Sequence, residues 1–357
     1  MQKPAKILVI NLGSTSTKIA LFEAENMLVT ESVNHTTEDL KQYTSIIDQY
    51  ELRKNTILDF VSRKGFLLDE IDVVASRGGN TKPIPGGIYE ICPAMIDDMK
   101  SGRYGQHPNM CGGIIAYELG REHSIPALTV DPPTIDEMCV PARYSGIPQI
   151  RRQSSFHALN SKATARKIAA GLGKDYTSVN LIVAHLGGGI SVSAHRNGKV
   201  IDVNNSLDGD GPFSPERAGA LPAGDLVKLC FSGEYSREQI LRLLQGGGGL
   251  AAYLGTASGL EIEKRIAGGD TVAAEVFEAM CYQIAKEIGA CAAVLEGRVD
   301  AIALTGSLAY SKRVTESLEK KIAFIARVIP DPGENEMEAL AAGAMRYLNG
   351  EEELSVY

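Results

Sequence analysis

The sequence has no tryptophan, no long apolar run and no excess of positive charge. Its apolar runs stay well short of the roughly 20 residues that a membrane-spanning helix needs. The first residues, MQKPAK, are not followed by the apolar segment of a signal peptide, so we expect a cytoplasmic protein without a membrane partner. The net charge is −8 and the basic residues gather only in pairs, which argues against a nucleic-acid partner.

Two nucleotide-binding fingerprints are missing as well. The chain contains neither GxxxxGK[ST] nor GxGxxG, so it is not a P-loop enzyme, and the glycine run 187–189 is too weak to indicate a dinucleotide site. Six cysteines are scattered along the chain without a CxxC pair. This spacing favours packed, reduced thiols over disulfides or a zinc site.

The remaining composition is that of a globular α/β protein. A length of 357 residues predicts about two domains, each large enough to bury its own core. Hydrophobic residues make up 44% and charged residues 22% of the chain, which is ordinary for globular domains. The 37 glycines fit a fold with many tight turns around strands.

The most informative stretch is residues 6–22, KILVINLGSTSTKIALF. An apolar run rich in β-branched residues predicts a strand over 7–10, and residues 18–22 predict a second strand. Between them lies a turn of glycine and hydroxyl residues, followed by Lys18. Such a turn can hold phosphate, because glycine lets the backbone approach and N–H and hydroxyl groups donate. An ordinary hairpin between two core strands is the alternative.

This pattern recurs in the second half of the chain. Residues 180–195, NLIVAHLGGGISVSAH, align with the opening stretch so that Asn11 falls on His185, 174 residues later. Residues 299–307 likewise match 71–79, in the same order. Two matches in order predict two copies of one α/β unit. The alternative is that buried strands before glycine turns simply look alike.

Periodicity and turn residues predict most of the other elements. Ser236 and Ser258 each begin a capping box, Asn109 is expected to cap a helix, and two prolines make 82–87 a loop. The polar stretch 202–211 is expected to be a loop as well. The expected helices are 51–64, 110–122, 151–170, 271–296 and 336–347, and further strands are expected at 71–75 and 127–130.

Polar residues recur where strands and turns are expected to end. These positions can converge, because ligands of α/β sheets bind beyond the carboxyl ends of the strands. Each residue also has an ordinary explanation, such as a surface ion pair or a turn. Together they suit phosphoryl transfer, which needs positive groups around the phosphoryl oxygens and a magnesium site supplied by carboxylates, here through water. The residues are Asn11, Arg77, Asp131, His157, His185, Arg217 and Glu336.

With these residues in place, the chain resembles the acetate kinase family, and within it the butyrate kinase branch. This family belongs to the superfamily of sugar kinases, actin and heat-shock chaperone ATPases. The resemblance covers nearly the full length, and its motifs are specific as a set. The stretches that carry it are INLGSTSTK, SRGGNTKPIPGG, RRQSSFHALN, HLGGGISV, GPFSPERAGALP, ALTGSLAYS and PGENEMEALAAGA.

The resemblance implies two duplicated ribonuclease-H-like domains that flank a nucleotide cleft. The first would span 1–151 and carry the carboxylate and one phosphate turn, with a C-terminal helix from about 338–357 packing back on it. The second would span 152–337 and bind the nucleotide. The implied reaction moves the γ-phosphate of ATP to butyrate or a related short-chain fatty acid, reversibly and with Mg²⁺. A homodimer or higher homo-oligomer is implied too.

The resemblance also assigns roles to single residues. The expected catalytic residues are Arg77, His157, Arg217 and Asp131, and Arg77 and His107 are expected to bind the acid. The metal site is expected at Asn11, Asp131 and Glu336, although Glu334 and Glu338 are close enough in sequence to compete for that role. The expected ATP/ADP ligands are Asn11, Gly13, Ser14, Lys18, His185, Gly187, Gly188, Gly189, Thr305, Gly306 and Ser307.

Two departures from the family pattern affect these expectations. Acetate kinases carry a second histidine where this chain has Ser161, and the segment after His107 differs from the usual one of the butyrate kinases that the chain resembles. The preferred acid therefore stays open between butyrate, acetate or propionate, and a branched-chain acid. A non-enzymatic ATP-binding switch of the same fold is a distant alternative, which would not need Arg77 or His157.

Overall fold

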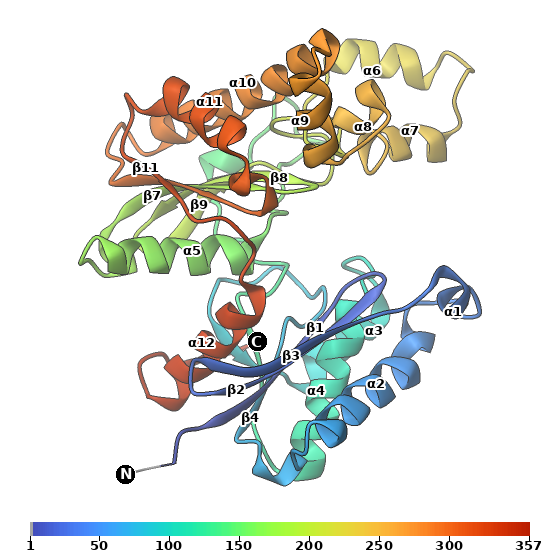
Figure 1. The fold of residues 1–357 in the computed structure, drawn as a ribbon, viewed down its shortest axis with the longest axis vertical. Coiled ribbons are helices and arrows are strands. Elements are labelled where there is room, and N and C mark those ends of the chain that lie inside the picture. The colour runs from blue at the N-terminus through green and yellow to red at the C-terminus, as the bar shows by residue number, and fades with distance from the viewer. Residues whose placement is uncertain (1–2) are drawn as a thin grey trace. The chain divides into compact units, whose positions relative to one another are not determined.

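The computed structural model describes residues 3–357, apart from the side chain of Thr37. The chain forms two compact units, coloured along the sequence in Figure 1. Unit 1 contains Met1–Asp136 and Asn335–Tyr357, and unit 2 contains Glu137–Glu334. Among the described residues, no helix is long and apolar enough to cross a membrane. All six cysteines are free thiols, as predicted, but Cys230 is exposed and not packed as expected.

Unit 1 is built on a seven-stranded sheet with the order β12-β5-β6-β4-β1-β2-β3. Its strands are β1 (Lys6–Leu12), β2 (Ser16–Glu23), β3 (Asn26–Asn34), β4 (Val73–Ser76), β5 (Ile88–Glu90), β6 (Ala127–Val130) and β12 (Leu354–Ser355). Its helices are α1 (Thr37–Lys41), α2 (Tyr50–Arg63), α3 (Pro93–Ser101), α4 (Asn109–His123) and α12 (Glu336–Leu348), with 3₁₀ turns η1 (Ile47–Gln49) and η2 (Leu68–Glu70).

Unit 2 is built on a five-stranded sheet with the order β11-β10-β7-β8-β9. Its strands are β7 (Asn180–Leu186), β8 (Ile190–Arg196), β9 (Lys199–Val203), β10 (Ala301–Thr305) and β11 (Val328–Pro330). Its helices are α5 (Ala158–Gly171), α6 (Ala223–Cys230), α7 (Arg237–Leu244), α8 (Gly249–Leu254), α9 (Gly259–Ala267), α10 (Thr271–Val294) and α11 (Lys312–Ile322), with 3₁₀ turns η3 (Pro141–Arg143), η4 (Tyr176–Ser178) and η5 (Ser307–Tyr310).

The two sheets repeat one plan. In each, an antiparallel meander (β1-β2-β3 or β7-β8-β9) has a parallel strand, β4 or β10, beside its first strand. Asn11 and His185 occupy the same place, one residue before the end of that first strand. The turn after β1 is one residue longer, because Leu12 pairs with Thr17 whereas Leu186 pairs with Ile190. The duplication predicted from sequence is thus confirmed in topology.

Alternating side chains of β7 explain how helices cover both faces of the second sheet. Ile182 and Ala184 pack in one cluster with α10 and α11, and Leu181 and Val183 pack in another with α5. Figure 1 shows α10 and α11 on one side of this sheet and α5 on the other. The buried face of α10 begins at Ala273, whereas Val272 is 57% exposed.

Three predicted helix starts were wrong in part. Helix α5 begins at Ala158 and not at 151, because Arg152 is held by Asp202 and by the Ala142 carbonyl, both at 2.9 Å. Asn109 is the first residue of α4 and does not cap it. The hydroxyl of Ser258 caps α9, but the carboxylate of Glu261 does not close the expected box. The box at Ser236 is complete.

The unit boundaries lie earlier than expected, at 136/137 and 334/335 in place of 151 and 337. The reason is that Glu137 already belongs to the second core: its carboxylate pairs with Lys162 at 3.0 Å and accepts from the Val200 N–H at 2.8 Å. The C-terminal segment with α12 returns to unit 1.

Residues 202–211 form a loop except at their start, since β9 extends to Val203. The expected cleft between the domains stays a prediction.

Candidate active site

The first candidate phosphate site is the turn after β1, residues 13–16. The Gly13 N–H donates to the Ser16 carbonyl at 2.9 Å, and a Cβ on Gly13 would lie 2.8 Å from the Ser16 hydroxyl oxygen. A side chain at position 13 would therefore require the Ser16 hydroxyl to move. Ser14 is exposed at the tip, and exposed Lys18 pairs across the strands with Asn11. The predicted ligands in this half of the chain therefore share one turn.

A polar cluster gathers next to this turn, within unit 1. The Asn11 amide donates to the Glu336 carboxylate at 2.7 Å. Arg77 follows β4, and its Nη1 lies 3.0 Å from one oxygen of Glu336 and 3.1 Å from the other. Glu336 is the first residue of α12, where the positive end of the helix dipole also favours a carboxylate. Three predicted residues from distant parts of the sequence thus meet at one carboxylate.

The structure separates the three glutamates that the sequence left open. Glu336 joins Asn11 and Arg77, whereas Glu338 is exposed on α12. Glu334 belongs to unit 2, where one carboxylate oxygen lies 4.0 Å from Nε2 of His185. Of these three glutamates, only Glu336 contacts Asn11, as expected for two residues of one metal site.

His107 is held as a neutral imidazole. Its Nδ1 accepts from the Asn109 N–H at 3.2 Å, so in the neutral ring the proton lies on Nε2. Burial lowers the pKa of His107 below its ordinary value, and the charges of Arg77 and Arg53 lower it further. A neutral ring beside an arginine suits a pocket for an acid, because it adds a donor without a second full charge.

Asp131 follows β6 in a left-handed conformation, with φ of 42°. It is 1% exposed, and its carboxylate accepts from the Gly87 N–H at 3.0 Å. This bond ties the end of β6 to the loop before β5. Its expected part in the metal site stays a prediction.

In unit 2, two histidines stack in parallel. The rings of His157 and His185 lie 3.7 Å apart, with 9° between their planes. His157 precedes α5 and its Nδ1 lies 3.1 Å from the Ser191 hydroxyl, and His185 is 2% exposed at the end of β7. The two predicted histidines are therefore fixed as one pair.

Asn160 orients the buried member of this pair. Its Nδ2 donates to the Glu334 carbonyl at 2.5 Å, so its Oδ1 is the atom that lies 2.7 Å from Nδ1 of His185. An oxygen can only accept, so the proton of a neutral His185 lies on Nδ1. No role for Asn160 was predicted, although it ends the motif RRQSSFHALN that contains His157.

Arg217 packs against the second candidate phosphate turn, residues 187–189. A Cβ on Gly189 would lie 2.5 Å from the Arg217 Cζ, so only glycine leaves room for the guanidinium. The Arg217 side chain donates to the Ser206 carbonyl, and its N–H donates to the Ser214 hydroxyl at 3.1 Å. Burial lowers its pKa, yet an arginine stays charged. The structure therefore brings a cation to the tip of the predicted loop.

Thr305, Gly306 and Ser307 form the turn after β10. Thr305 is fully buried and donates to the Gly333 carbonyl at 2.9 Å, whereas Ser307 is exposed. Gly306 has φ of 85°, and a Cβ there would collide with the Leu186 carbonyl. This turn thus packs closely on the end of β7, next to residues 187–189. Its expected contact with adenosine stays a prediction.

Ser161 replaces the second histidine of the acetate kinases. It is 1% exposed, and its hydroxyl lies 2.8 Å from that of Ser193 and 3.2 Å from Nε2 of buried His195. Nδ1 of His195 lies 2.8 Å from the Tyr176 hydroxyl. This position is therefore part of a buried polar network.

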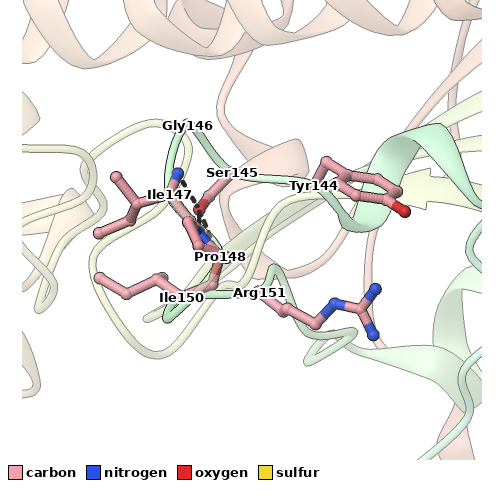
Figure 2. A pocket seen from close by; sticks show the side chains of 7 residues that line it. All are labelled: Tyr144, Ser145, Gly146, Ile147, Pro148, Ile150 and Arg151. Atoms are coloured by element: carbon pink, nitrogen blue, oxygen red, sulfur yellow. Dashed lines mark hydrogen bonds between the residues drawn. The ribbon is translucent and has the colours of Figure 1, made fainter.

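Figure 2 shows a surface pocket of about 360 Å³ elsewhere in unit 2. One loop lines it, with the side chains of Ile147 and Ile150 beside one another and Arg151 reaching below Tyr144. None of the predicted site residues lines this pocket, and its lining contains neither a carboxylate nor a histidine. It is not the candidate active site.

Among residues 3–357, no group of three or more His, Cys, Asp or Glu side chains forms a protein metal cage. Mg²⁺ does not require one, because it commonly keeps its waters and binds one or two carboxylates together with substrate phosphates. Glu336 and Asn11 both carry side-chain oxygens that can act as metal ligands, and they lie beside a phosphate turn, so they fit that kind of site.

Similarity to known proteins identifies the family of this chain. The model of the acetokinase family matches residues 131–342. The chain is also 50% identical over 352 residues to butyrate kinase 2 of Clostridium acetobutylicum, which covers 99% of both proteins. The chain belongs to the acetokinase family. The resemblance read from the motifs is thereby confirmed over the full length.

Solved structures agree in fold. The acetate kinase of Porphyromonas gingivalis matches with a TM-score of 0.78 at 21% identity, covering 96% of this chain and 100% of that one. A propionate kinase of Francisella tularensis matches with a TM-score of 0.75 at 20% identity, covering 95% and 98%. At such low sequence identity these two matches support the fold alone. They confirm the predicted duplicated actin-like architecture.

Proposed function

We propose that this member of the acetokinase family is a butyrate kinase. It transfers the γ-phosphate of ATP to the carboxylate of butyrate or a related short-chain fatty acid, and forms ADP and the acyl phosphate reversibly. The observation that carries the proposal is the 50% identity to a butyrate kinase over 99% of both chains. The cluster of Asn11, Arg77 and Glu336 supports it, because it provides a carboxylate-binding cation beside a phosphate turn.

Arg77 is the proposed ligand of the acid. Only its Nη1 bonds to another side chain among the described residues, and that partner is Glu336. Nη2 and Nε therefore remain as a planar pair of donors, the geometry with which arginine binds a carboxylate through two parallel bonds. The bound acid would then be oriented with one oxygen toward the phosphoryl group. Neutral His107 is proposed to complete the acid site.

The remaining roles are divided between the units. Residues 13–18 and 187–189 are proposed to bind the phosphates, and the turn 305–307 the adenosine. Arg217 and His157 are proposed to stabilise charge on the transferring phosphoryl group, where positioned cations give most of the catalysis.

Asp131 is proposed to orient the metal site. Mg²⁺, held through water by Glu336, Asn11 and Asp131, would neutralise phosphate charge. We further propose that the protein is cytoplasmic, since the cytoplasm supplies ATP. A homo-oligomer is proposed as well, as the family resemblance implies.

The test is a substrate scan with purified protein, ATP, Mg²⁺ and unbranched or branched acids of two to five carbons. Acyl phosphate is trapped as hydroxamate and ADP is measured by a coupled assay. We expect the highest kcat/KM with butyrate, and turnover of neighbouring acids, since one methylene in an apolar pocket is worth only about 1–3 kcal/mol. Higher kcat/KM with acetate, propionate or a branched acid would reassign the substrate, and no turnover at all would refute the kinase.

Arg77→Ala tests the acid site separately. We expect KM for the acid to rise at least tenfold while KM for ATP changes little, because the variant loses a ligand of the acid alone. Arg103→Ala is the matched control, since Arg103 is exposed in the same unit. An unchanged KM for the acid in the Arg77 variant would contradict this assignment.

A further inference from the structure

Arg53 is a buried cation for which the proposed reaction has no role so far. It lies on α2, and its side chain is 0% exposed. Arginine is almost never buried this completely without an acidic partner. Arg63, near the end of the same helix, is the ordinary case: it is 46% exposed and paired with Asp59 and Glu31.

The bonding partners of Arg53 are all uncharged. Its Nη1 donates to the Ser16 carbonyl at 2.6 Å and to the Thr17 hydroxyl at 3.0 Å. Its Nη2 donates to the Ser14 carbonyl at 3.1 Å and to the Gln49 side chain at 3.0 Å. Within residues 3–357 no carboxylate pairs with it, and its buried Nε has no partner. The charge is therefore buried without a counter-ion, an arrangement that is costly for folding.

Three of these bonds hold the first phosphate turn from inside. Because a peptide unit is planar and trans, its C=O and N–H groups point in opposite directions. When Arg53 draws the Ser14 carbonyl inward, the N–H of Thr15 is turned outward. Successive outward N–H groups in a turn form an anion-binding concavity. The guanidinium thus shapes the surface on which a phosphate would lie.

The positive charge also acts beyond its own bonds. It contributes to lowering the pKa of His35, whose Nε2 lies 2.8 Å from the Thr17 hydroxyl, and to lowering that of His107. Burial keeps water and salt from screening such a charge. Its field therefore reaches both the phosphate turn and the proposed acid pocket.

We propose that Arg53 is a positioning residue for the nucleotide: a fixed cation beneath the first phosphate turn, whose missing counter-charge is supplied by the phosphate chain of ATP. The inference rests on the proposed function for the identity of the anion. It differs from a purely structural role, in which Arg53 would only attach α2 to the turn and its charge would not matter.

The experiment compares Arg53→Gln, which removes the charge and keeps an amide donor, with Arg53→Lys, which keeps the charge and loses the fork. Arg63→Gln is the matched control on the same helix. Calorimetry on the full chain measures Kd for MgATP, MgADP and adenosine. We expect Arg53→Gln to weaken both nucleotides at least tenfold and adenosine less than twofold, and Arg53→Lys to keep MgATP within about threefold of native. Circular dichroism verifies the fold of each variant.

An equal loss for MgATP and adenosine in Arg53→Gln, or native affinity for both, would overturn the proposal. If the Gln variant does not fold, the Lys variant decides: a loss of tenfold or more in MgATP affinity by a folded Arg53→Lys protein overturns it, and retained affinity supports it. These binding measurements do not depend on the acid. A native protein that binds MgATP but phosphorylates no acid would refute the proposed function and leave this inference to its own test.

Discussion

A single methyl group at Gly189 should disable the proposed phosphoryl-binding arginine. The Cβ of Gly189→Ala would lie 2.5 Å from Cζ of Arg217, whereas real Cβ atoms essentially never approach other heavy atoms within 3.0 Å. Gly189 does not need a left-handed backbone, so alanine brings no backbone strain. The guanidinium, at the end of a flexible side chain, must therefore move aside and leave the Ser206 carbonyl.

The size of the effect follows from this displacement. A shift of a catalytic group by roughly 1 Å costs on the order of a hundredfold in rate, or about 2.7 kcal/mol in the activation barrier. We therefore expect kcat to fall about a hundredfold while KM for the acid stays close to native. Because the side chain can move at little cost, we expect the melting temperature to change little.

The assay is steady-state ADP release, with hydroxamate trapping to verify the product and calorimetric melting to verify the fold. Gly224→Ala is the control, because a Cβ there meets no atom within 4 Å and its helix lies outside the site. A Gly189→Ala enzyme with kcat within threefold of native would refute the argument.

Two further predictions concern histidines. Because burial and the nearby arginines lower the pKa of His107, the unfolded chain binds its proton at higher pH than the folded chain does. The free energy of unfolding should thus fall as pH drops through the ordinary histidine range, and denaturant titrations should show a shallower fall in His107→Gln; equal slopes would contradict this. Asn160→Ala should shift His185 from the Nδ1–H tautomer toward Nε2–H in ¹⁵N spectra, and an unchanged tautomer would show that Asn160 does not set it.

The central strands were predictable because each is a buried apolar run that ends at a turn, whereas the mostly exposed strand β3 was not predicted. Ile7 to Ile10 are fully buried, and β6 has the bounds that its four residues indicated. Duplication was readable for the same reason, since the pattern of strand, polar residue and glycine turn recurs with little change. Such local signals do not depend on what the strand packs against.

The start of α5 was not predictable, because a distant contact decides it. Residues 151–157 contain nothing that prevents a helix, but Arg152 reaches Asp202, which lies on β9. The glutamate that joins the candidate site could not be chosen from sequence for a similar reason. Glu336 is distinguished from Glu334 and Glu338 only by its bonds to Asn11 and Arg77, 325 and 259 residues away in sequence.

Arg53 and Asn160 were missed because their residue types indicate something else. An arginine within a predicted amphipathic helix is normally placed on the solvent side, and nothing in ELRKNTILDF marks its burial. An asparagine after an expected helix start looks neutral, and the partners of Asn160 are 25 and 174 residues away.

The route of the chain through unit 1 has a consequence for how the protein is made. This unit takes its last helix, its edge strand β12 and Glu336 from residues that follow all of unit 2 in sequence. During synthesis all residues of unit 2 therefore leave the ribosome before Glu336 can bond to Asn11 and Arg77. Domains tend to fold as their residues emerge. We expect unit 2 to fold first, and unit 1 to stay incomplete, with Gly343 not yet packed on Val130, until residues 335–357 have been synthesised.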